Sequence, residues 1–208
     1  MGTQVSGGWP DPHLRRWMLF VDGENFTFRG QDFANQSGIA PVAGDYYEQD
    51  VFIWLPQVRG TQGIYGSNTL RIEQQAIRAY YYTSLTGDDS KITAIRAKLW
   101  QLGFQPEVFK KTRQNEKAKG VDIALCKDML IHAVYSNYDV AIIVAGDGDY
   151  VPLINEVKRL GKTVVVAFFE NCGLNRELML MSDKFYNIEA KFLEKWRVHL
   201  RASFGEAR

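Results

Sequence analysis

The sequence predicts an α/β fold in which a mainly parallel sheet of about five to six strands carries helices on both faces. Two observations support this prediction. Short apolar runs alternate along the chain with segments of helical periodicity, which is the order that builds a parallel sheet. The runs at residues 139–145 (DVAIIVA) and 163–168 (TVVVAF) also lack polar alternation, which is typical of strands covered on both faces.

Each expected strand is a short apolar run bounded by turn or polar residues, and the six runs are residues 16–21, 76–83, 104–109, 139–145, 163–168 and 184–188. Helices are expected where apolar residues recur every three or four positions, at residues 91–102, 121–135, 150–160, 174–181 and 189–201. The first of these helices has Asp88, Asp89 and Ser90 as candidate caps, and the third has Asp149.

A segment of about forty residues separates the first two strands. Residues 29–68 contain six glycines and look irregular, although residues 51–58 could form a short helix or strand. Aromatic residues in this segment either stack on unpaired bases or pack beneath the loop as a small core; they are Tyr46, Tyr47, Phe52, Trp54 and Tyr65.

The length of 208 residues suits one domain and is short for two. We expect a flexible segment over residues 1–15 and a single domain over residues 16–208. Within that domain we expect an insertion at about residues 29–70 and a C-terminal helix at about residues 189–201. A homo-oligomer is compatible with the sequence.

Charge and cysteine content exclude several classes of protein. Lys and Arg number 25 against 24 Asp and Glu, so the chain lacks a histone-like excess of positive charge, and any nucleic-acid contact must come from a local patch. The two cysteines form no C-x-x-C motif. The first sixteen residues lack the apolar stretch of a signal peptide, and no apolar run is long enough to span a bilayer. We therefore expect a cytoplasmic protein with no membrane contact.

Carboxylates follow two of the predicted strands and begin one predicted helix. Asp22 comes directly after the first strand, Asp147 and Asp149 follow the fourth, and Asp122 lies at the start of the helix between the third and fourth strands. Open parallel sheets bind ligands outside the carboxyl ends of their strands, so these side chains are expected at one edge. Each residue taken alone could instead cap a helix, favour its dipole or end a strand.

Crowded carboxylates repel one another, and a divalent cation removes the conflict. Hard oxygen ligands suit Mg²⁺ or Mn²⁺, which activate water and clamp phosphate oxygens. The pattern therefore predicts metal-assisted cleavage of a phosphodiester. The chain contains no P-loop, no H-E-x-x-H and no G-x-S-x-G motif that would point to other chemistries.

Positive charge is concentrated between residues 91 and 119, which carry a net charge of +6 and leave −5 for the rest of the chain. The end of this segment runs directly into Asp122, so it could guide a polyanion such as RNA to an acidic pocket. The alternative is a solvated polar loop. The candidate substrate-binding residues are Lys110, Lys111, Arg113, Lys117 and Lys119.

Four motifs in order along the chain, VDGEN, KGVD, AGDGDYVPLI and LMLMSDKFYNIE, resemble the NYN domain family, a branch of the PIN-like nucleases, and within it the LabA-like bacterial group. The resemblance spans roughly residues 18–188. It implies a Rossmann-like sheet and, in many members, metal-dependent ribonuclease activity. By motif, an acidic Mg²⁺ or Mn²⁺ site would consist of Asp22, Asp122, Asp147 and Asp149, with Asn25 as the polar residue beside the first aspartate.

The sequence departs from the family pattern in two respects. Ala145 and Gly148 occupy positions where a serine is frequent, and the insertion after the first strand is larger than a minimal member needs. Neither change removes a carboxylate. We expect a metal-dependent endoribonuclease, and the alternative is a non-catalytic regulatory or RNA-binding module. A phosphatase is less consistent with the sequence, because Gly23 and Glu24 follow Asp22 in place of a D-x-D arrangement.

Overall fold

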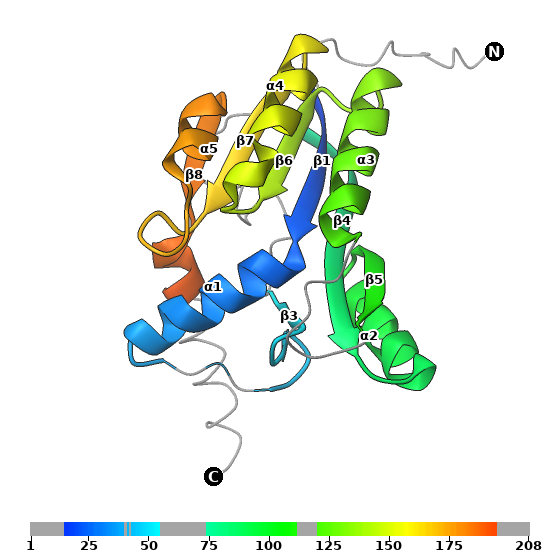
Figure 1. Ribbon diagram of the computed structural model, residues 1–208, viewed down its shortest axis with the longest axis vertical. Coiled ribbons are helices and arrows are strands. Elements are labelled where there is room, and N and C mark those ends of the chain that lie inside the picture. The colour runs from blue at the N-terminus through cyan, green and yellow to red at the C-terminus, as the bar shows by residue number, and fades with distance from the viewer. Residues whose placement is uncertain (1–14, 40, 42, 55–73, 112–119, 195–208) are drawn as a thin grey trace, which may run out of the picture.

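The computed structural model describes residues 15–39, 41, 43–54, 74–111 and 120–194. Six strands form one parallel sheet in the order β5-β4-β1-β6-β7-β8 (Figure 1). The strands are β1 (Arg15–Asp22), β4 (Gln74–Thr86), β5 (Gln105–Lys111), β6 (Val140–Val144), β7 (Thr163–Phe168) and β8 (Lys184–Asn187). The α/β class, the parallel sheet and the six expected strands are confirmed.

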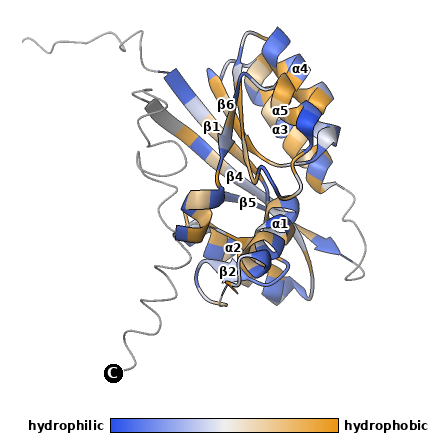
Figure 2. Ribbon diagram, turned by 90° about the vertical axis from the view of Figure 1, so that its left-hand side faces the viewer, coloured by the Kyte–Doolittle hydropathy of each residue, from blue (hydrophilic) through white to orange (hydrophobic). Residues whose placement is uncertain are grey.

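Helices cover the sheet on both faces, because successive residues of each strand point to opposite sides. Leu19 and Val21 of β1 enter one core, whereas Met18 and Phe20 enter the other. The first core is closed by α1 (Gly23–Gln36) and α2 (Asp89–Gln101). The second is closed by α3 (Val121–Val134), α4 (Val151–Arg159) and α5 (Arg176–Met181), which Figure 2 shows grouped apart from α1 and α2.

The two apolar runs that predicted a doubly covered sheet form its central strands. Every residue of β6 is buried, and so is every residue of β7 after Thr163. Parallel pairing of Val21 with Val144 and of Asp22 with Tyr82 brings the carboxyl ends of β1, β6 and β4 to the same edge. Asp22 lies at that edge as the last residue of β1, and Asp147 and Asp149 lie just beyond the end of β6.

Helix α1 corrects the expected irregular segment, because its second half lies within residues 29–68. Asp22 caps this helix by accepting a hydrogen bond from the backbone N–H of Asn25 at 3.0 Å. Phe26 stacks on Phe169, whose ring centroid is 5.6 Å away, beyond the end of β7. Long-range aromatic packing of this kind stabilises a helix whose local sequence has weak helical propensity.

A small hairpin follows, formed by β2 (Tyr47–Glu48) and β3 (Phe52–Ile53). Gln31 on α1 holds its turn, because its side chain accepts from the backbone N–H of Asp50 at 3.0 Å and donates to that residue's carboxylate at 2.9 Å. Tyr47, Phe52 and Trp54 are buried, so these aromatics pack beneath the segment and do not present faces for base stacking. Tyr65 lies outside the described residues.

Two local assignments differ from the sequence prediction. Lys110 and Lys111 were expected in a loop, but they are the last residues of β5, paired with Leu85 and Thr86. Asp149 does not cap α4; a short 3-10 helix, η1 (Gly148–Tyr150), precedes α4, and Asp147 caps it. The C-terminal helix begins at residue 189 as expected and is described to residue 194. Its predicted end at residue 201 lies outside the described residues.

No helix in the described part of the chain is long and apolar enough to cross a membrane.

Candidate active site

Asp22 lies at the junction of β1 and α1 and is only 4% exposed. Burial raises the pKa of its carboxyl to about 7, and repulsion from Asp122 and Glu24 acts in the same direction. Hydrogen bonds from the backbone N–H of Asn25 and from the Tyr150 hydroxyl oppose that pKa rise. Asp22 is therefore a buried acid placed among other acids, which is a common arrangement in functional sites.

Tyr150 connects two of the predicted carboxylates. Its hydroxyl oxygen lies 2.9 Å from Oδ2 of Asp22 and 3.1 Å from Oδ1 of Asp122. Both distances run to one oxygen, so the two carboxylate oxygens are separated by no more than the sum of these distances, about 6 Å. A hydroxyl has one proton and can donate fully to only one of them. The structure therefore brings Asp22 and Asp122 together with an incomplete set of donors.

Asn25 holds the turn that carries Asp147. Its side-chain Oδ1 accepts a hydrogen bond from the backbone N–H of Gly146 at 2.9 Å, and the Gly146 carbonyl accepts from the backbone N–H of Asn175 at 2.8 Å. A Cβ at Gly146 would meet the Phe168 ring at 2.3 Å, so the turn lies close against β7. Asn25 therefore fixes the turn at Gly146 that precedes Asp147. The two residues that make this contact are 121 positions apart in the sequence.

Gly148, one of the two departures from the family pattern, also has a structural reason. A Cβ there would lie 2.4 Å from Nδ2 of Asn175, whose side chain caps α5. A serine at residue 148 would displace this cap. Glycine at this position therefore fits the close packing of η1 against the start of α5.

The other predicted metal ligands are less enclosed. Asp122 and Asp149 are exposed and Asp147 is half-buried, with its Oδ1 accepting from the backbone N–H of Asp149 at 3.1 Å. Within the described residues, no group of three or more His, Cys, Asp or Glu side chains is arranged to hold a metal ion. The oxygen donors of Asp22 and Asp122 fit the chemistry of a hard cation, whereas a complete ligand set is not pre-assembled.

Glu24 and Lys111 form a second charged group beside Asp22; the sequence predicted a substrate-binding role for Lys111 and no role for Glu24. The Glu24 carboxylate accepts from the hydroxyl of Ser84 and forms an ion pair with the Lys111 ammonium. The Lys111 side chain is only 9% exposed. The sequence signal was present in the DGEN motif, but the partners of Glu24 come from the ends of β4 and β5 and depend on strand register.

The predicted basic residues therefore fall into separate environments. Lys110 is exposed and pairs with Asp89 at 3.0 Å, whereas Lys111 is turned inward to Glu24. The remaining three, Arg113, Lys117 and Lys119, lie outside the described residues.

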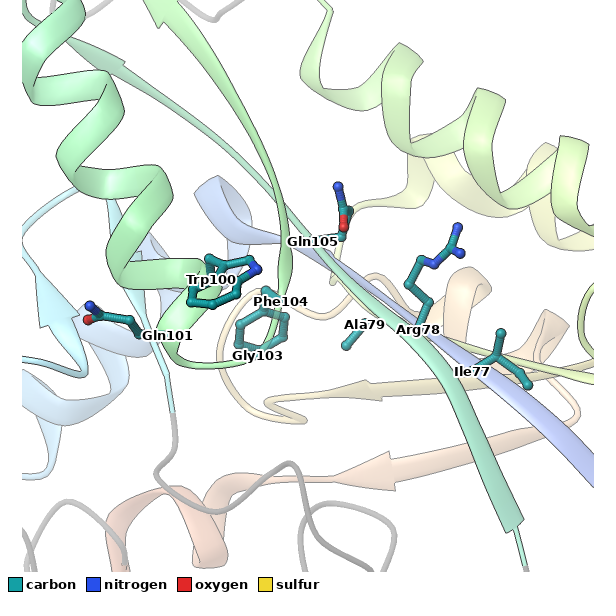
Figure 3. A pocket seen from close by; sticks show the side chains of 8 residues that line it. All are labelled: Ile77, Arg78, Ala79, Trp100, Gln101, Gly103, Phe104 and Gln105. Carbon is teal, nitrogen blue, oxygen red and sulfur yellow. The ribbon is translucent and has the colours of Figure 1, made fainter.

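Two cavities differ in their relation to this edge. One, of about 340 Å³, lies at the carboxyl ends of β4 and β5, and both Ser84 and Lys111 line it. The other, of about 370 Å³, lies by the amino end of β5 and contains Arg78 and the exposed ring of Trp100 (Figure 3). No carboxylate lines the second cavity, so it lacks the acidic chemistry of the first edge.

The parallel sheet and the aspartates at the carboxyl ends of its central strands define an α/β protein of the Rossmann-like type with an acidic site. The sequence profile of the NYN domain matches residues 16–189, and the chain belongs to this family. NYN domains are a PIN-like nuclease family, so the kind of reaction indicated is hydrolysis.

A solved structure shows the same fold. A protein of unknown function from Vibrio parahaemolyticus superimposes with a TM-score of 0.59 at 19% sequence identity, and the match covers 86% of this chain and 96% of that one. At this identity the likeness concerns the fold alone. No curated protein is significantly similar to the chain.

Proposed function

We propose that this chain is a divalent-metal-dependent endoribonuclease that hydrolyses RNA phosphodiester bonds at the carboxyl edge of its sheet. The observation that carries the proposal is the meeting of Asp22 and Asp122 at the single hydroxyl of Tyr150. Two carboxylates that share one proton donor favour a nearby cation. Membership of a nuclease family supports the same reaction. Within that family we assign the chain to the LabA-like group, on the motifs AGDGDYVPLI and LMLMSDKFYNIE.

In this proposal Asp22, Asp122, Asp147 and Asp149 hold Mg²⁺ or Mn²⁺. When bound, such an ion supplies an activated water and neutralises charge on a phosphate oxygen. Tyr150 orients the Asp22 and Asp122 carboxylates through its hydroxyl. Asn25 orients the Asp147 turn through Gly146, so it is a positioning residue.

Positive charge near the end of β5 supports RNA as the substrate. Lys110 is exposed there, and Arg113, Lys117 and Lys119 follow it along the chain toward Asp122. These four would draw the phosphate backbone to an edge that is otherwise acidic. Lys111 acts differently, because its ammonium faces Glu24 inside the cavity wall.

End-labelled RNA incubated with Mn²⁺, with and without chelator, tests the reaction. We expect cleavage that chelator abolishes and that Asp147→Asn reduces by at least about 100-fold, since each catalytic group contributes on the order of 10²–10⁴-fold. Asp32→Asn, at an exposed position on α1, is the matched control and should cut normally. A circular RNA distinguishes internal from terminal cleavage, because only an endonuclease opens it.

The alternative is a non-catalytic RNA-binding or regulatory module of the same fold. The observation in its favour is that three metal-ligating side chains are not gathered among the described residues. This alternative predicts RNA binding that neither metal nor Asp147→Asn affects, together with no cleavage. Cleavage that survives in purified Asp147→Asn would instead show that the activity comes from another site or a contaminant.

A further inference from the structure

The cavity at the carboxyl ends of β4 and β5 adjoins the acidic site. Glu24 is two residues beyond Asp22, and its carboxylate contacts the side chains of Ser84 and Lys111. Both of those residues line the cavity. The cavity is therefore separated from Asp22 by a single charged group, which is the position that a neighbouring part of a bound substrate would occupy.

Its lining combines an aromatic face with positive charge. Phe28 on α1 is 44% exposed and lines the cavity, in contrast to the buried aromatics of the nearby hairpin. Lys91 at the start of α2 lines the same cavity, whereas the Lys111 ammonium is paired with Glu24. The Asp50 carboxylate, also in the lining, accepts from the Gln31 side chain. Among the described residues no ion pair involves Lys91, which is exposed. Aromatic faces next to cations are the usual means by which proteins hold single-stranded nucleic acid.

The cavity is also preformed. One wall is the turn between β2 and β3, which includes Gln49 and Asp50. Gln31 fixes this turn on α1 through two hydrogen bonds to Asp50, and Thr83 on β4 donates to the Val51 carbonyl. A volume of about 340 Å³ lies in the range of small-molecule pockets, and is enough for one base and its sugar.

We propose that this cavity receives one unpaired nucleotide of single-stranded RNA, next to the phosphodiester that is cut. The base stacks on Phe28, the neighbouring phosphate faces Lys91, and Gln49 and Thr86 are available to the base edge. A base in a duplex would first have to leave its pair and its stack before it could enter the cavity. The substrate class is therefore single-stranded. This inference rests on the proposed function.

Binding measured without cleavage tests the proposal. The probe is a fluorescein-labelled 12-nucleotide single-stranded RNA in chelator, read by anisotropy. Phe28→Ala should weaken binding at least about fivefold, because losing one stacked base costs about 1–3 kcal/mol. Phe28→Tyr should restore binding. Trp100→Ala is the matched control, since Trp100 is an aromatic residue 70% exposed at the other cavity, and this change should leave the affinity unaltered.

The other outcomes are decisive in the same assay. Three results would overturn the cavity as the binding site. The affinity of Phe28→Ala could equal that of the wild type, or Phe28→Ala and Trp100→Ala could lose the same affinity. Phe28→Ala could also lose as much affinity for a duplex probe as for the single strand. The same loss on single-stranded DNA would overturn RNA as its specific occupant. If Phe28→Ala weakens binding but the wild type cuts nothing with Mn²⁺, the proposed nuclease function fails while the cavity stands. If Phe28→Ala cuts RNA with an unchanged KM, the cavity fails while the nuclease stands.

Discussion

The hydroxyl of Tyr150 lies 2.9 Å from Oδ2 of Asp22, although the two residues are 128 positions apart in the sequence. Both side chains are buried, and Asp122 approaches the same hydroxyl from α3. Burial beside these carboxylates raises the pKa of Tyr150, so this side chain acts as a proton donor to the acids and does not ionise in the physiological range. The contact joins the end of β1 to η1, the short helix that follows β6. The candidate metal site lies at this junction.

Removing that hydroxyl should destabilise the protein in a pH-dependent manner. Tyr150→Phe loses a donor to buried acids, and we expect a loss of about 1–3 kcal/mol in the free energy of unfolding. The loss should be larger at pH 8 than at pH 5.5, because the hydrogen bond favours the ionised form of Asp22. Urea unfolding at both pH values in chelator provides the measurement. Tyr138→Phe, which loses a bond to the Met129 carbonyl, should show a loss that does not depend on pH.

Asp22 should make the metal-free protein less stable as the pH rises. Its folded-state pKa of about 7 lies above the ordinary carboxyl value, so its protonated form is the one that folding favours. The associated stability is fully present below about pH 4 and is lost as the pH rises through about 7. Asp22→Asn retains an N-cap acceptor for Asn25 and should remove this part of the pH dependence. Melting temperatures between pH 4 and 8 in chelator should be flatter for Asp22→Asn than for Asp32→Asn; parallel curves would contradict the assignment.

Divalent metal should stabilise the folded protein. An ion that binds the native carboxylates but not the unfolded chain adds about 2.7 kcal/mol at a concentration 100 times its dissociation constant. Mn²⁺ or Mg²⁺ should therefore raise the melting temperature at pH 7.5. Asp122→Asn and Asp147→Asn should each remove most of the shift, whereas Asp32→Asn should retain it. A shift of equal size in all four proteins would place the ion elsewhere.

The basic residues near the end of β5 should determine how RNA binding depends on salt. Replacing Lys110, Arg113 and Lys117 with Gln should reduce the slope of log affinity against log salt by about 0.7 per lost contact with a single strand, and so by about 2 in total. Turnover at saturating RNA should change less. Lys111 is left in place because its removal would leave the largely buried Glu24 carboxylate without its cation. Arg159→Gln with Lys162→Gln, near the amino end of β7, is the control pair. An unchanged slope would show that the three replaced positions are a solvated surface.

The local sequence was sufficient to predict the sheet and the edge at which Asp22 and Asp147 lie. The apolar runs of β6 and β7 have a composition that only a doubly covered strand accommodates, and they are buried as predicted. Asp22 and Asp147 could be placed at one edge because parallel strands end together. The helix α1 could not be predicted in the same way, since Phe26 is stabilised by Phe169 far along the chain.

Strand register and packing between distant segments decided the details of the site. Asp22 meets Tyr150 and Glu24 meets Lys111 only because β1, β4, β5 and β6 pair in one particular order. The same packing places Phe28 and the hairpin turn around a cavity that no motif in the sequence indicates. Strand periodicity is a local property, and the sequence by itself determined which runs form strands, whereas pairing with β4 decided where β5 ends. The partners of each charged side chain depend on contacts across dozens of residues, and only the tertiary structure decided those.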